Sequence, residues 1–185
     1  VVYSRGTAYT LGANVEHLRI LATGTSRGTG NTLSNTLWAG AGNNVMTGGS
    51  GSDTVSYAYA GAAVAVSLSS TAAQATGGSG SDTLSGFEFL TGSAYSDRLS
   101  GNSAANRLSG GAGNDRLTGG SGADTLTGGS GNDDFRFIAR TDGGDTISDF
   151  AAGQDRIAVM AANFGLVAGS SARVRVDAGP TTAAG

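Results

Sequence analysis

A nine-residue pattern recurs along much of this 185-residue chain and limits the folds that it can form. The pattern is GGxGxDxUx, in which U is a large apolar residue. It is complete at residues 48–56, 77–85, 110–118, 119–127 and 128–136. Two incomplete copies join the last three into one block, and a second block of three copies begins at Gly30, with Asn35 and Asn44 in the aspartate position of its first two copies. Because so short a unit cannot bury its own apolar residue, the copies must stack on one another.

Each copy divides into a glycine-rich turn of six residues and a strand of three. Glycine tolerates positive φ and lets neighbouring backbones approach closely. Side chains alternate across a strand, so only the middle strand residue points inward. The inward residues are Leu37, Met46, Val55, Leu84, Leu99, Leu108, Leu117, Leu126 and Phe135. The sequence therefore predicts an all-β fold, a parallel β-roll (β-solenoid) in which two nonamers make one coil.

The composition indicates that apolar burial alone does not hold this chain together. Hydrophobic residues make up 38% of the chain and aromatic residues 6%. The chain has no cysteine, which excludes disulfides and cysteine-built metal sites. All eleven basic residues are arginine and the net charge is -3, so we expect no nucleic-acid partner. We also expect no membrane span, because no apolar run approaches ~18 residues.

The aspartates of the pattern point to a bound cation. Turns 18 residues apart lie above one another in such a roll, which aligns Asp97, Asp115 and Asp133 on one edge and Asn106 with Asp124 on the other. Strands stack ~4.8 Å apart, so these carboxylates repel one another unless cations lie between them. Calcium accepts six to eight oxygen ligands, whereas magnesium demands strict octahedral geometry. Calcium is therefore expected, the alternative being that each aspartate caps its own turn.

The array resembles the nonapeptide repeats of RTX (repeats-in-toxin) proteins, which fold as calcium-loaded parallel β-rolls and are typically exported by type I secretion. The flanks "YTLGANVEHLRILATGT" and "GGDTISDFAAGQDRI" are similar to that family too. The resemblance implies several calcium ions with the carboxylate ligands Asp53, Asp82, Asp97, Asp115, Asp124 and Asp133. The implied carbonyl ligands are Gly49, Gly51, Gly78, Gly80, Gly111, Gly113, Gly120, Gly122, Gly129 and Gly131. Sites at Asn35, Asn44 and Asn106, which depart from the pattern, are expected to be weaker or empty.

The segment after the roll has two expected roles. Asp145, Asp149 and Asp155 are candidates for one more calcium site. A β-hairpin is expected to cover the last coil with Ile147, Phe150 and Ile157. The expected organisation is a first strand unit at 1–29, repeats at 30–56, a strand insertion at 57–76, repeats at 77–136 and a capping segment at 137–185.

The resemblance also implies where the chain is located and which partners it has. It indicates a module of a larger secreted protein, extracellular or on the cell surface, that folds on calcium binding and supports or positions a partner domain. Its expected partners are the linked neighbouring domains and the type I secretion machinery. An RTX adhesin is an alternative parent. The parent protein could also be an epimerase, a protease or a lipase.

A polysaccharide-binding module, of the kind appended to alginate epimerases, is the second hypothesis. Arg98 and Arg116 would form a cationic ladder toward an acidic polysaccharide such as alginate, and Trp38 would stack on a sugar ring. The plainer interpretations are an arginine row partly paired with nearby acids and a tryptophan covered by residues 57–74.

No catalytic function is expected of the chain itself. His17 is its only histidine, and the single GxSxG match, at residues 24–28, has no strand followed by a helix around it.

Overall fold

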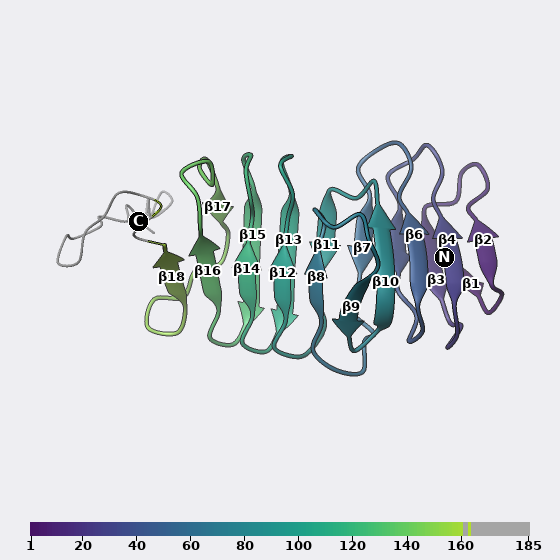
Figure 1. Cartoon of the computed structure of the whole chain (residues 1–185), viewed down its shortest axis with the longest axis horizontal. Helices are drawn as coiled ribbons and strands as arrows, with labels where there is room; N and C mark the ends of the chain where they lie inside the picture. Colours follow the sequence, from purple (N-terminus) through teal and green to yellow (C-terminus); the bar gives the residue numbers. More distant parts are fainter. Residues whose placement is uncertain (161–162, 164–185) are drawn as a thin grey trace, which may run out of the picture.

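The computed structural model describes residues 1–160 and 163, which form an elongated stack of β coils (Figure 1). One face is a parallel sheet of β1 (Val2–Ser4), β3 (His17–Ile20), β5 (Thr36–Trp38), β7 (Thr54–Ser56), β11 (Phe89–Thr91), β13 (Arg107–Ala112), β15 (Thr125–Ser130) and β17 (Thr146–Ile147). The described residues contain no α-helix, and no helix among them is long and apolar enough to cross a membrane. The predicted all-β parallel β-roll is confirmed.

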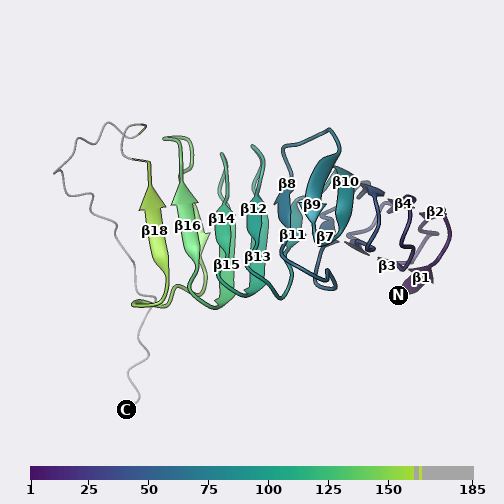
Figure 2. The same ribbon diagram turned by 60° about the horizontal axis from the view of Figure 1, so that its bottom comes forward.

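The opposite face consists of two sheets. The first contains β2 (Ala8–Thr10), β4 (Ser26–Thr29), β6 (Asn44–Thr47), β10 (Gly80–Ser85) and β9 (Gln74–Gly77). The second contains β8 (Ala65–Ser67), β12 (Arg98–Ser100), β14 (Arg116–Thr118), β16 (Asp134–Phe137) and β18 (Arg156–Val159). Figure 2 shows β12, β14, β16 and β18 following one another toward the C-terminal end of the stack.

The core is a column of apolar side chains between the two faces. On the eight-stranded face, Leu90 of β11 is in register with Leu108 of β13, and Leu108 with Leu126 of β15. On the opposite face Leu117 is in register with Phe135. All nine predicted inward residues are at most 3% exposed, which confirms that they point inward as the sequence indicates, although strands such as β13 and β15 have six residues rather than three.

Between β7 and β11, the strands do not join the stack in the order in which they follow one another in the sequence. β10 pairs in parallel with β6, whereas β8, which precedes it in the chain, pairs with β12 further along the stack. β9 runs antiparallel to β10, and Val64 bridges to Gly77. This rearrangement buries Tyr57, which is 1% exposed, and brings donors from residues 64–79 against turns far away in the sequence.

The predicted C-terminal β-hairpin is wrong for the described residues. β17 adds in parallel to β15, and β18 adds in parallel to β16, so residues 146–159 form one more coil. The physical reason is that both faces end in an open strand edge, and each edge accepts one strand. Phe150 packs on Phe135 with ring centroids 6.2 Å apart. The remainder of the expected capping segment, 161–162 and 164–185, lies outside the described residues.

Candidate metal sites

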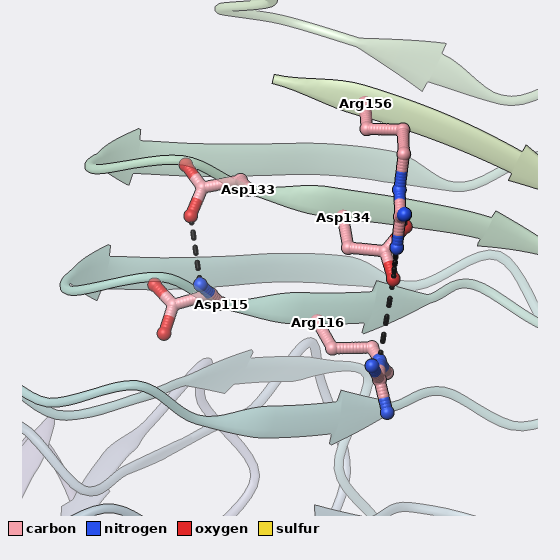
Figure 3. Close-up of polar contacts among 5 residues, drawn as sticks. All are labelled: Asp115, Arg116, Asp133, Asp134 and Arg156. Carbon is pink, nitrogen blue, oxygen red and sulfur yellow. Dashed lines mark hydrogen bonds and ion pairs between the residues drawn. The ribbon is translucent and has the colours of Figure 1, made fainter. Parts of the chain in front are cut away.

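The aspartate turns stack in two columns, as the 18-residue spacing predicts. On one edge, the N–H of Asp97 donates to Oδ1 of Asp115 at 2.7 Å. The N–H of Asp115 donates in turn to Oδ1 of Asp133 at 2.8 Å, as Figure 3 shows. On the other edge, the N–H of Asn106 donates to Oδ1 of Asp124 at 2.7 Å. Asp53 accepts from the N–H of Asn35 in the same way. One carboxylate oxygen of each turn thus links two coils.

The second carboxylate oxygen separates the aspartates into two groups. In four of them Oδ2 is buried and has no hydrogen-bond donor in the described part of the chain; they are Asp53, Asp115, Asp124 and Asp133. These residues are at most 2% exposed. A buried carboxylate oxygen without a partner is costly, so each of these turns requires either a proton or a cation.

The glycines of these four turns hold a conformation that other residues rarely adopt. Gly111 and Gly113, in the turn before Asp115, have φ values of 111° and 109°. The corresponding glycines of the other three turns also have positive φ; they are Gly49, Gly51, Gly120, Gly122, Gly129 and Gly131. A Cβ on Gly110 would collide with Oδ2 of Asp115 and with the carbonyl oxygen of Gly128 in the next coil. The turn of Asp115 is therefore a cradle lined by carboxylate and carbonyl oxygens.

Burial raises the pKa of these carboxyl groups. The pKa of Asp115 is raised to about 7, chiefly by burial; the N–H of Asp97 opposes the rise, and the charges of Asp97 and Asp133 add to it. The pKa values of Asp53, Asp124 and Asp133 are raised as well, with burial again the largest cause. Folding therefore disfavours the charged forms of these groups, which a bound cation would stabilise.

The donor set fits calcium. It consists of oxygen atoms, which a hard cation prefers, and a carbonyl oxygen of another turn lies close to the carboxylates of Asp53 and Asp115. In the described part of the chain, no three His, Cys, Asp or Glu side chains gather closely enough to hold a metal ion by themselves. Backbone carbonyls would therefore have to supply a share of the ligands of a bound ion.

Asp82 and Asp97, which were expected to act as ligands, have carboxylates already occupied by protein donors. Oδ1 of Asp82 accepts from the N–H and Nδ2 of Asn44, and its Oδ2 lies 3.1 Å from the Thr76 hydroxyl, whose one proton it shares with the carbonyl oxygen of Gly80 at 2.9 Å. For Asp97, Oδ1 accepts from the N–H of Val64 and the Ser93 hydroxyl, and Oδ2 from the N–H of Ser93. Sequence reasoning missed the donors Val64 and Thr76 because they come from the rearranged segment.

The acids after the roll cap the last turns. Asp149 accepts from the N–H groups of Gly128 and Gly129 at 2.9 and 2.7 Å. Asp155 accepts from the N–H groups of Asp133 and Ala151 at 3.0 and 2.7 Å. Both oxygens of each side chain therefore accept hydrogen bonds from backbone N–H groups. A metal role for Asp149 and Asp155 remains a prediction.

Two further acids lie beside the turn of Asp124. Oδ1 of Asp145 accepts from the N–H of Asp124 at 2.9 Å. Sequence reasoning missed Asp142, which is 7% exposed and accepts from the N–H groups of Ile138 and Ala139. Burial is the main cause of the raised pKa values of Asp124 and Asp145, and the charge of Asp142 adds to both. The acidic run "TDGGD" was the only sign of this residue in the sequence.

The arginine row is partly neutralised. Arg98 and Arg116 are in register on β12 and β14, as expected. Nε of Arg116 lies 3.3 Å from Oδ2 of Asp134, and Nη2 of Arg156 lies 3.0 Å from the same oxygen (Figure 3). Asp134 lies between Arg116 and Arg156, so it reduces the positive charge that the arginine row offers to an anionic ligand.

Trp38 belongs to an aromatic cluster on the outer surface of the eight-stranded face. Its ring centroid lies 5.7 Å from that of His17 and 6.4 Å from that of Tyr59. The Arg19 guanidinium lies 3.4 Å from the centre of the Tyr59 ring. Tyr59, from the segment expected to cover the tryptophan, is 57% exposed, so the cluster is still accessible.

A comparison with protein families agrees with this geometry. The model of the RTX calcium-binding nonapeptide repeat matches the chain in four copies, at residues 29–57, 74–88, 85–117 and 100–135. No curated relative matches the chain.

Proposed function

This chain belongs to the family of RTX calcium-binding repeat proteins, and from that premise we propose that it is a structural module whose roll becomes ordered when calcium binds. The observation that supports the proposal is a set of four buried Oδ2 atoms that find no donor within residues 1–160 and 163, at Asp53, Asp115, Asp124 and Asp133. These carboxylates and the carbonyls of their glycine turns would hold the ions. Calcium would supply the positive charge that lets the carboxylates align.

The binding energy of the ions would then contribute to folding. An ion that binds only the ordered coils stabilises them by mass action. In a cytosol with little free calcium, the repeats would stay unfolded and suitable for export by type I secretion. Outside the cell, where calcium is abundant, they would fold and support or position a linked domain. Any catalytic activity of the parent protein would then lie in that other domain.

A calcium titration of the calcium-depleted protein, followed by far-UV circular dichroism, tests this proposal. The β signal should increase with added calcium and reach a plateau, whereas the same concentration of magnesium should produce much less of it. A spectrum that calcium leaves unchanged, together with no binding heat in calorimetry, would contradict the proposal.

Polysaccharide binding is a second candidate, and the exposed aromatic cluster favours it. Trp38 and Tyr59 present ring surface beside the cationic Arg19. Aromatic rings stack on the apolar faces of sugars, and a guanidinium binds carboxylates. Affinity for alginate that falls in Trp38→Ala would support this candidate. Loss in Arg98→Ala/Arg116→Ala with Trp38→Ala unaffected would locate the site on the arginine row instead.

A further inference from the structure

We infer that calcium controls mainly the C-terminal coils of this roll, after Ser109, whereas amide and hydroxyl groups hold most of the preceding coils without metal. The inference rests on the proposed calcium function and assigns that function mainly to one part of the chain. Its basis is the difference between turns in which an aspartate oxygen has no donor and turns in which protein groups satisfy the polar atoms.

The turn of Asn44 shows how a coil closes without a cation. Its Nδ2 donates to the carbonyl oxygens of Gly40 and Gly42 at 3.1 and 2.6 Å and to Oδ1 of Asp82 at 2.9 Å. Its Oδ1 accepts from the Ser26 hydroxyl at 2.8 Å. A neutral amide thus bonds the carbonyls of its own turn, the same kind of oxygen that calcium would take. Asn44 thus satisfies the turn carbonyls, which in an aspartate turn a bound cation would satisfy.

The turns of Asn35 and Asn106 are closed in a similar way. Nδ2 of Asn106 donates to the carbonyl of Glu88 at 3.1 Å, and its Oδ1 accepts from the N–H of Asn102 at 2.7 Å. Nδ2 of Asn35 donates to the carbonyl of Val15 at 3.3 Å, and its Oδ1 accepts from the N–H of Asn31 at 2.7 Å. Neither amide adds a negative charge to its column.

Protein groups also lie against Asp82 and Asp97, and two of these groups come from the rearranged segment. Asn44 donates to Asp82, whose Oδ2 lies near the Thr76 hydroxyl, and Val64 and Ser93 donate to Asp97. Up to Ser109, therefore, Asp53 is the one aspartate of a nonapeptide turn with a buried, unpartnered Oδ2. The other three such oxygens follow one another at Asp115, Asp124 and Asp133.

The distribution of the core supports the same division. Residues 57–106 bury side chains from outside the regular repeat, including Tyr57, Val66 and Phe87. After Ser109, the buried hydrophobic residues in the described part of the chain are Leu117, Leu126 and Phe135. The unpartnered carboxylates are therefore concentrated where apolar burial is least.

Hydrogen–deuterium exchange of the full chain, read by mass spectrometry with and without calcium, tests the division. In the calcium-free protein, amides of residues 110–137 should exchange at least about tenfold faster than with calcium, while those of β4, β6, β10 and β12 keep their protection. Equal loss of protection in both regions would overturn the inference and leave the proposed calcium function intact. Protection that calcium changes nowhere would overturn both.

A pair of variants tests the amide substitution itself. Asn44→Asp removes the donor to Gly40 and Gly42 and places a second carboxylate beside Asp82. Calcium-free Asn44→Asp should therefore exchange about tenfold faster in β4 and β6. The matched control is Asn43→Asp, one residue away and exposed, where a carboxylate still accepts from the N–H of Ser81. Unchanged protection in Asn44→Asp, or equal loss in both variants, would overturn the role assigned to the amide.

Discussion

The backbone N–H of Asp115 donates to Oδ1 of Asp133 at 2.8 Å (Figure 3), and Oδ2 of Asp133 is buried and has no donor among the described residues. The two oxygens of one carboxylate therefore differ in role. Oδ1 joins neighbouring coils through a hydrogen bond that requires no metal. Oδ2 remains available for a cation, so the same residue supplies register and, in our proposal, calcium affinity.

The first prediction contrasts two aspartates of the same column. Asp115→Asn should remove a calcium site, because the unpartnered Oδ2 is lost. At calcium about a hundredfold above the dissociation constant, this should lower the free energy of unfolding by about 3 kcal/mol. Asp97→Asn should leave the number of bound ions unchanged, since protein donors already occupy both oxygens of Asp97. Native mass spectrometry counts the ions, and loss of an ion in Asp97→Asn would contradict the assignment.

The second prediction concerns the first glycine of a turn. In Gly110→Ala the new methyl group would meet Oδ2 of Asp115 and the carbonyl of Gly128, so the coil must shift. We expect a loss of about 2 kcal/mol in the calcium-loaded protein, measured by urea denaturation. Gly61→Ala is the control, since a Cβ there meets nothing within 4 Å and should change stability by less than about 0.5 kcal/mol.

The third prediction is a pH dependence with opposite signs for the two states. Folding raises the pKa of Asp115 from 3.8 to about 7 in the metal-free protein. The folded state thus holds its proton more tightly than the unfolded state, and this contribution to stability is full below pH ~4 and lost as pH rises through about 7. The metal-free C-terminal coils should therefore be better ordered at pH 5 than at pH 8.

Calcium affinity should follow the reverse course. The ion must displace the proton from Asp115, so affinity should increase as pH rises from 5 toward 7 and then level off. Calorimetry at several pH values measures both the affinity and the protons released. An affinity that does not change between pH 5 and pH 8 would show that the carboxylate is not a ligand.

The fourth prediction concerns the ion pairs around Asp134. Asp134→Asn breaks its contacts with Arg116 and Arg156. Because the two arginine side chains are 42% and 70% exposed, the free energy of unfolding should fall only slightly, and the loss should shrink at high salt. A larger, salt-independent loss in thermal denaturation would mean that Asp134 does more than form surface pairs.

Repetition made much of the fold predictable. Because Leu108 and Leu126 recur at 18 residues in the middle of matching RLS and TLT segments, alternation and stacking identify them as buried and in register. The final coil was not predictable in the same way. The stretch between Ile147 and Ile157 contains a turn-like "AAGQD", which fits a hairpin equally well. The open edges of β15 and β16 explain why two parallel strands form instead.

The candidate site was predictable as a set of columns but not turn by turn. The spacing of Asp115 and Asp133 suffices to stack them. It does not show which oxygens find donors, because Val64 and Thr76 reach Asp97 and Asp82 through a segment that departs from the repeat. The asparagine turns were expected to be weak sites, but their amide bonds to carbonyl oxygens depend on a turn geometry that the sequence does not specify.

Anomalous scattering from crystals grown with millimolar calcium would test the central claim most directly. We predict calcium peaks beside Oδ2 of Asp53, Asp115, Asp124 and Asp133, each shared with glycine carbonyls. Turns without such peaks at these four residues, in crystals of protein that calcium has saturated in solution, would contradict the account.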